Sequence, residues 1–375
     1  MKRILALLLC LLLCVGTLAA CGEPENPTTS TDSSTDGSDV VSGTTDTESE
    51  KKPQLYDPEA EHKLIMDDSA TKIIVVDLDK GGDSPEEYDI GSSVIWEWNA
   101  HYAGSPMQGK TVNIDCTKYR YSAYYKKDVI VFSGSGGWVG IIDYATKELL
   151  FYDNPGLGPH SVELMPNGDL VLACSGNSDS ANGRLIYYPL STGATKQSSY
   201  VMLNSAHSVC WDPVNEVLWG LGGREINAYQ ISGYGTKSAK IQKISGMGVS
   251  LGNLGYSGGH EMTPKFGEPG KYWVSVSNCI LLFDANKESV SNIFTHSGKY
   301  NGKSVKGIAY FPDGTMVITA HDQGGTGTYR SSILKFVYLT KSEGKVSSTI
   351  VKTADVPHRK GSQTYKLEVF SKDYQ

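Results

Sequence analysis

The sequence lacks several features that would assign it to a familiar class. Clear amphipathic helices are absent, and abundant Tyr and Gly favour many short strands joined by tight turns. An excess of basic residues is also missing. The formal net charge is −7, and residues 53–375 are close to neutral, so there is no basic footprint for nucleic acid. No C-x-x-C pair occurs among Cys116, Cys174, Cys210 and Cys279, which leaves disulfides or buried free thiols as alternatives.

The N-terminus has the features of an export signal. Two basic residues precede the apolar run Ile4–Val15, which is too short for a comfortable transmembrane helix. The run leads to Leu18-Ala-Ala-Cys21, which resembles the lipobox of bacterial lipoproteins. We predict a lipoprotein signal peptide over residues 1–20 and lipidation of Cys21. An ordinary signal peptide with a chance cysteine is the alternative.

Residues 21–52 form the predicted linker. Ser, Thr, Asp, Glu, Gly and Pro dominate it, and it carries eight acids with no base before Lys51. Such a stretch has almost nothing to bury and is expected to be disordered. As a flexible coil it spans about 31 Å. The prediction is a protein held by lipid alone at the outer face of a bacterial cell membrane.

The rest of the chain, residues 53–375, contains a repeat. Similar segments start at His160, His207, His260 and Lys306, and a degenerate copy starts near Tyr119. In the clearest copies an alternating strand meets a Pro-containing turn, and a second apolar strand follows. The spacing is that of a four-stranded propeller blade.

We therefore predict an all-β fold: a β-propeller of six four-stranded blades, with seven as the alternative. The sixth blade needs parts from both ends of the chain. Lys72–Asp77 and Ser93–Trp98 supply its third and fourth strands, and Thr364–Phe370 supplies an earlier one. Pairing the terminal strands closes the ring and removes the open edge of a linear array.

Several short segments carry a family resemblance: Trp96–Trp98, Gly158–Ser161, Ala206–Val209, Gly258–His260 and Val305–Gly307. In these the chain, over about residues 70–375, resembles an uncharacterised family of six-bladed β-propeller lipoproteins of gut and soil bacteria. The resemblance implies the fold and assigns no activity.

The first strand of each blade lines the channel, so equivalent positions form a ring. The aligned positions are Tyr119, His160, His207, His260 and Lys306. The three histidines could hold one divalent metal, with Mn or Zn the expected ions. Lys306, Arg120 and Tyr119 are the candidate ligand-binding residues, and the two cations would suit a carboxylate or sulfate on the same rim.

Three interpretations of the histidines stay open: a structural role, a metal site, or metal-free binding or acid–base chemistry. The arrangement is similar to that of propeller polysaccharide lyases, above all oligogalacturonate lyase. That resemblance implies a metal that acidifies a proton beside a uronate carboxylate. The chain departs from that family in blade number and offers only His321 as a weak fourth ligand. Glu163 and Glu261 follow the ring histidines, and Glu261 ranks low as a base because alternation along the strand would turn it away from the channel. Gly255–Gly259 matches a hydrolase nucleophile elbow by chance.

Two classes of function follow. The first is a surface-anchored protein that binds an extracellular glycan or a partner protein at the channel face. The alternative is a metal-dependent polysaccharide lyase or hydrolase that acts on acidic glycans through the three-histidine site. Fold alone does not decide between them, because propellers host many unrelated activities.

Overall fold

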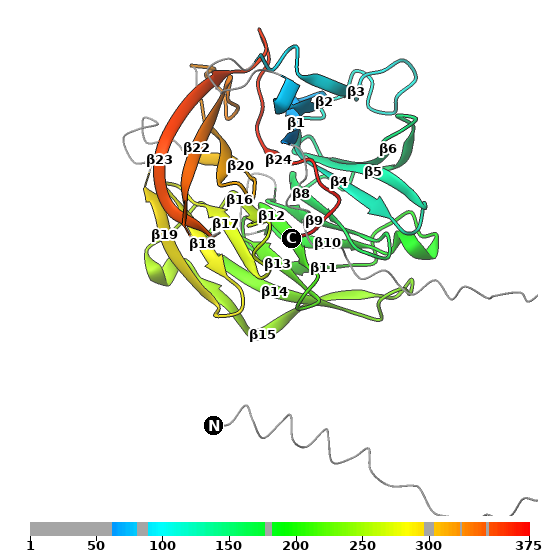
Figure 1. The fold of residues 1–375 in the computed structure, drawn as a ribbon. Helices are drawn as coiled ribbons and strands as arrows, with labels where there is room; N and C mark the ends of the chain where they lie inside the picture. Colours follow the sequence, from blue (N-terminus) through cyan, green and yellow to red (C-terminus); the bar gives the residue numbers. More distant parts are fainter. Residues whose placement is uncertain (1–61, 81–88, 177–181, 296–303, 323–324, 343–344) are drawn as a thin grey trace, which may run out of the picture. The chain divides into compact units, whose positions relative to one another are not determined.

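The computed structural model describes residues 62–80, 89–176, 182–295, 304–322, 325–342 and 345–375. These residues form six four-stranded antiparallel sheets arranged as the blades of a β-propeller (Figure 1). The predicted all-β propeller is confirmed, with six blades rather than seven. The predicted signal peptide, Cys21 and the linker over 21–52 lie outside the described residues.

The blades are numbered in chain order, and each is given from its innermost strand outward. Blade 1 holds β24 (Leu367–Val369), β1 (Lys63–Asp68), β2 (Lys72–Asp77) and β3 (Val94–Asn99). Blade 2 holds β4 (Ile114–Ser122), β5 (Lys127–Gly134), β6 (Trp138–Asp143) and β7 (Leu149–Asp153). Blade 3 holds β8 (Pro159–Leu164), β9 (Leu170–Cys174), β10 (Arg184–Tyr188) and β11 (Ser199–Met202).

Blade 4 holds β12 (Ser208–Asp212), β13 (Val217–Leu221), β14 (Glu225–Ser232) and β15 (Lys240–Ser250). Blade 5 holds β16 (Glu261–Pro264), β17 (Lys271–Ser275), β18 (Cys279–Asp284) and β19 (Ser289–Thr295). Blade 6 holds β20 (Val305–Tyr310), β21 (Thr315–Ala320), β22 (Ile333–Ser342) and β23 (Lys345–Pro357). Within the described residues, three short 3₁₀ helices connect strands: η1 (Leu78–Lys80), η3 (Leu190–Thr192) and η4 (Gly252–Leu254).

The Pro-containing turns that revealed the repeat have a clear geometric basis. The Gly168 N–H donates to the Met165 carbonyl at 2.8 Å, and Gly314 donates to Phe311 at 3.0 Å. The two glycines have φ values of 94° and 101°. Only glycine adopts this conformation without strain, so the tight reversal after the first strand is encoded locally.

Blade 1 closes the ring, as predicted, with strands from both ends of the chain. β24 pairs antiparallel with β1, with Leu64 opposite Val369 and Met66 opposite Leu367. The sequence interpretation identified β2, β3 and the C-terminal strand but missed β1. Closure leaves β1 covered on both sides within its sheet.

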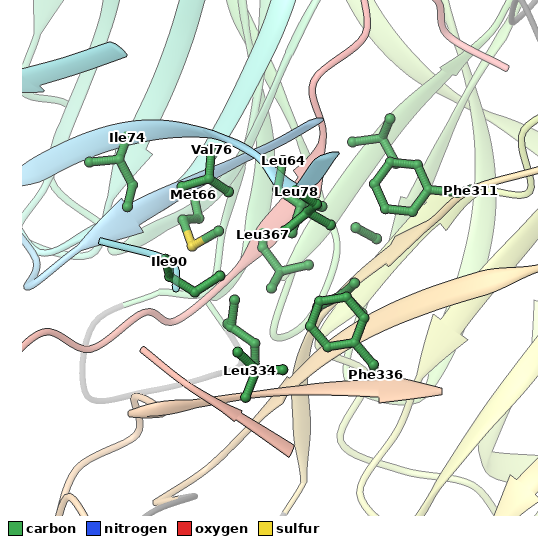
Figure 2. Close-up of a cluster of buried hydrophobic side chains, with 14 of the residues drawn as sticks. Leu64, Met66, Ile74, Val76, Leu78, Ile90, Phe311, Leu334, Phe336 and Leu367 are labelled. Carbon is green, nitrogen blue, oxygen red and sulfur yellow. The ribbon is translucent and has the colours of Figure 1, made fainter. Parts of the chain in front are cut away.

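Apolar side chains seal the junction between the last blade and the first (Figure 2). Leu64, Met66 and Val76 of blade 1 pack with Phe311 and Phe336 of the blade 6 segment, and all five are buried. Burying a side chain of this size contributes about 1.5–3 kcal/mol. The core therefore lies between blades, and the channel is free to carry polar residues.

The four cysteines of the propeller are free thiols in buried positions, which answers the alternative posed by the sequence. Within the described parts of the chain, no helix has both the length and the apolar character needed to cross a membrane.

Candidate functional site

Six residues, one from each blade, meet at the end of the channel where the innermost strands begin. We call this set the mouth ring: Asp115, His160, His207, His260, Lys306 and Tyr365. Each lies at the start of an innermost strand or one or two residues before it. Because the innermost strands of neighbouring blades lie side by side, their starts converge.

The three histidines lie side by side, as the repeat predicted. The rings of His160 and His207 stack with centroids 4.5 Å apart and an interplanar angle of 11°. His260 meets His207 edge to face at 5.0 Å. Nδ1 of His160 lies 3.1 Å from the Asp115 carboxylate, and Nδ1 of His207 donates to the Ser205 carbonyl at 2.8 Å. The Ser205 hydrogen bond orients the His207 ring, whereas Asp115 faces Nδ1 of His160 without hydrogen-bond geometry. Nε2 has no partner among the described residues on either ring.

Lys306 and Tyr365 complete the ring. Lys306 Nζ lies 2.9 Å from Nε2 of His260 and 5.9 Å from the Tyr365 ring centroid. The Tyr365 ring lies 6.0 Å from that of His160. Among the described residues the Tyr365 hydroxyl has no hydrogen-bond partner, although the residue is buried. The Tyr365 hydroxyl is therefore available to a ligand.

A pocket of about 230 Å³ opens beside the ring. Its lining includes Asp115, His160, Tyr365, Tyr329 and Arg330. Arg330 comes from the segment between β21 and β22 and donates to Asp115 at 3.1 Å and to the Ile114 carbonyl at 2.9 Å, besides its ion pair with Asp67. Tyr329 is 66% exposed, so an aromatic face stands at the entrance.

Three basic groups of the mouth ring have lowered pKa values, because they are buried beside other positive charges. Burial, with His160 and two nearby lysines, holds the pKa of His207 well below its usual value. Burial and Lys306 do the same to the pKa of His260. Burial and the charge of Lys366 lower the pKa of Lys306 to about 7. The mouth thus concentrates four basic groups, and Asp115 is the one carboxylate of the mouth ring.

Below the mouth ring, the channel is filled by a buried ion network, which we call the channel network. It consists of Lys118, Arg120 and Lys366 with Glu163, Glu261 and Glu368. Glu163 accepts from Lys118 at 2.9 Å and from Arg120 at 3.0 Å. Lys366 lies 3.0 Å from Glu261 and donates to the carbonyls of His207 and His260. A ligand would therefore reach the mouth ring from the open end.

The structure corrects two of the predicted ligand-binding residues. Arg120 does not share a rim with Lys306: it is 2% exposed, belongs to the channel network and donates to the Ser371 carbonyl. Tyr119 points away from the channel, with its ring stacked on Phe370 at 4.0 Å. The prediction placed β4 four residues out of register. Cys116 lies opposite Ser161 and Lys118 opposite Glu163, so Asp115 is the counterpart of His160.

The geometry also bears on the predicted metal. The described residues contain no group of three or more His, Cys, Asp or Glu side chains placed to hold a metal ion. The rings of His160 and His207 are stacked nearly parallel, so their nitrogens do not converge on one point. Nε2 of His260 already faces Lys306. The arrangement favours a metal-free site. The site of Mn or Zn on His160, His207 and His260 stays a prediction, which metal analysis of the purified protein tests.

The structure also places the remaining sequence candidates, which are the possible fourth metal ligand, the possible base and the possible nucleophile elbow. His321 stacks on Tyr329 at 4.6 Å. Glu261, expected to turn away from the channel, is instead part of the channel network. Ser257 of the Gly255–Gly259 segment lies between η4 and β16, and no helix follows it as a nucleophile elbow requires.

Sequence reasoning missed Asp115, Tyr365 and Arg330. A usable signal exists for Tyr365. In most blades the ring residue stands directly before a small or polar residue and an apolar one, as in His160-Ser-Val, His207-Ser-Val and Tyr365-Lys-Leu, whereas Asp115-Cys-Thr ends in a polar residue. Arg330 comes from a connecting segment outside the repeat, so the blade pattern carries no information about it.

The family profile of DUF6528, described as a family of unknown function, matches residues 86–327, more than half of the chain. The chain belongs to this family. The match spans blades 2 to 5, with β3 and the first two strands of blade 6. It includes every mouth-ring residue except Tyr365. No curated protein matches the sequence.

Solved structures with a similar fold have low sequence identity. A functionally unknown protein from Desulfotomaculum acetoxidans DSM 771 is 11% identical, with a TM-score of 0.43 over 78% of this chain and 80% of that one. The Nidogen/Laminin complex gives 10% identity and a TM-score of 0.49 over 84% and 100%. The WD40 propeller domain of Doa1 gives 11% and 0.41 over 80% and 84%. These likenesses carry no argument about function.

Proposed function

We propose that this protein is a lipoprotein, anchored through Cys21 at the outer face of a bacterial cell membrane, whose mouth ring binds an acidic sugar of an extracellular glycan. The observation that carries the proposal is the convergence of one polar residue from each blade at a single open end. Nε2 of His160, Nε2 of His207 and the Tyr365 hydroxyl are available to a ligand.

The electrostatics favour an anionic ligand. His160, His207, His260 and Lys306 crowd together. Burial and repulsion from neighbouring positive charges lower the pKa of His207, His260 and Lys306. A bound carboxylate or sulfate would relieve that repulsion and gain charge-assisted hydrogen bonds. The exposed ring of Tyr329 at the pocket entrance suits the apolar face of a sugar. Together these features support an acidic sugar over a neutral one.

Calorimetric titration with pectic, alginate and glycosaminoglycan oligomers, beside neutral oligosaccharides, tests the proposal. At least one acidic oligomer is expected to bind, and neutral ones are not. His160→Ala should weaken binding about tenfold or more, the effect of losing a hydrogen bond to a charged group. Lys196→Ala is the matched control, since Lys196 pairs with Asp153 at the outer surface. Failure of every acidic oligomer would overturn the proposal, and capture of a surface protein instead would establish the partner-protein alternative.

Binding of an acidic oligomer is expected to depend on pH. The free protein's Lys306 has a pKa of about 7, and an anion would raise it, so binding takes up a proton. Affinity should therefore rise as pH falls from alkaline values towards 7 and level off below it, with about a tenfold change for each unit by which the ligand raises the pKa. The groups that face Lys306 are His260, Tyr329, Tyr365, Lys366 and Asp115. Titrations across this pH range should show that Lys306→Met flattens the dependence of affinity on pH. An unchanged dependence would show that Lys306 is not the group that takes up the proton.

One observation favours a second candidate, acid–base catalysis on the same glycan. The Asp115 carboxylate beside Nδ1 of His160 leaves Nε2 as a free base. In β-elimination this base would take the proton next to the uronate carboxylate, the C–O bond to the leaving sugar would break, and that oxygen would take up a proton. The lyase predicted from the sequence was metal-dependent, whereas this ring supports a metal-free route. Ultraviolet absorbance of unsaturated ends decides it, because simple binding generates none.

A further inference from the structure

A second pocket, of about 450 Å³, lies beside the first on the connection from β23 to β24. Its lining includes His358, Lys360, Ser362 and Gln363 from that connection and Thr326 from the β21–β22 segment. Pro357, the last residue of β23, also lines it, and the pocket includes no mouth-ring residue. Most of its lining residues are polar.

His358 is the unusual member of this second pocket. Only 6% of the residue is exposed, yet neither ring nitrogen has a hydrogen-bond partner. Burial lowers its pKa to about 4, so the ring is neutral near pH 7. A neutral imidazole presents one donor and one acceptor, the complement of a hydroxyl group. Both nitrogens are themselves covered, and leaving them unsatisfied there is unfavourable, so a hydroxyl group that enters beside the ring would be stabilised.

Charge in this pocket comes from Lys360. The guanidinium of Arg359 is already engaged by Asp68 and by Glu97, the latter at 2.8 Å. Lys360 is exposed and forms no ion pair or hydrogen bond with any described residue. The pocket thus offers one uncompensated cation beside a hydroxyl-matching histidine.

The two pockets share a wall. Thr326 lines the second pocket, whereas Thr328, Tyr329 and Arg330 line the mouth pocket. Thr328 donates to the Gln363 side chain at 3.1 Å, and Gln363 belongs to the second pocket. Gln363 is two residues from Tyr365 of the mouth ring, which separates them by at most about 7 Å along the chain. One extended ligand can therefore reach both.

We propose that the glycan binds as an oligomer across both pockets, with an acidic sugar at the mouth ring and the hydroxyl and acidic groups of a neighbouring sugar on His358 and Lys360. This inference rests on the proposed function and adds that a single sugar does not fill the site. It also predicts two separable contributions to affinity, one from each pocket.

The test uses the intact protein and the best-binding acidic glycan of the panel, as oligomers of increasing length from the monosaccharide. Affinity should rise about tenfold or more once the oligomer reaches the second pocket, and then level off. Lys360→Ala and His358→Ala should each remove much of that rise while leaving monosaccharide affinity unchanged. Lys360 is exposed, so its variant is expected to fold even if the buried His358→Ala variant does not. Lys196→Ala is again the control.

The outcomes are distinguishable. Equal affinity for every length, or variants that weaken monosaccharide and oligomer alike, would overturn the two-pocket inference and leave the proposed function standing. No binding of any acidic glycan to the unmodified protein would overturn both.

Discussion

Glu163→Gln is expected to lower the free energy of unfolding by about 3–5 kcal/mol, because it leaves buried cations without their counter-charge. Glu163 is 1% exposed and accepts from both Lys118 and Arg120. The substitution keeps the side-chain shape, removes the charge and turns one acceptor oxygen into an NH2 donor that faces the same cations. Lys118 would retain Glu368 at 3.5 Å as its nearest acid. Denaturant unfolding of the two proteins measures the difference.

A second substitution separates charge balance from packing. Adding Lys118→Met to Glu163→Gln leaves two cations and two acids in the channel network, so it should recover part of the lost stability. Lys196→Ala removes an exposed ion pair and should change stability by less than about 1 kcal/mol. If Glu163→Gln costs no more than this control, the channel network does not stabilise the fold.

Removing residues 365–375 is expected to abolish cooperative folding. The deletion takes away β24, and with it the pairing of Leu367 and Val369 with β1 and their burial between blades 6 and 1. It also removes Lys366 and Glu368 from the channel network. An unpaired strand edge inside the ring favours association with other chains. Circular dichroism and sedimentation should show loss of the transition and aggregation.

A shorter deletion provides the graded control for this prediction. Residues 371–375 cross the far end of the channel, and the C-terminus lies near the middle of the blades in Figure 1. The Tyr374 hydroxyl donates to the Leu164 carbonyl at 2.7 Å, and the Gln375 side chain accepts from the Gly270 N–H at 2.8 Å. Their loss should cost a few hydrogen bonds, about 1 kcal/mol each, and leave a folded protein. A fully folded 365–375 deletion would contradict closure by β24.

Much of the fold was predictable because short local sequence patterns determine the strands and turns of each blade. The Pro-x-Gly turns fix a hairpin, and the apolar run after them fixes the second strand. The sequence interpretation missed β1 because Lys63–Asp68 is not flanked by such a turn. One of its two partners, β24, is separated from it by nearly the whole chain. β4 was misaligned for a similar reason, since its start carries Asp115 instead of a histidine and lacks the Pro-containing turn.

The candidate site was only partly predictable. The three histidines share one slot of a repeat, and that regularity is visible in sequence. The contacts that define their chemistry are not regular. Lys366 reaches across the channel to His207 and His260, and Arg330 enters from a connecting segment. Similarly, His358 stands out only because its surroundings leave it unsatisfied, which no residue pattern encodes.

The alkylation rates of the four buried thiols would measure local opening of the blades. Burial raises the pKa of Cys116 and Cys174 to about 12 and that of Cys279 to about 11, so almost no thiolate forms near neutral pH. Alkylation then requires the surrounding strands to separate first. Cys116 and Cys210 sit on innermost strands, Cys174 on a second strand and Cys279 on a third. Their relative labelling rates would map, blade by blade, where this ring opens first.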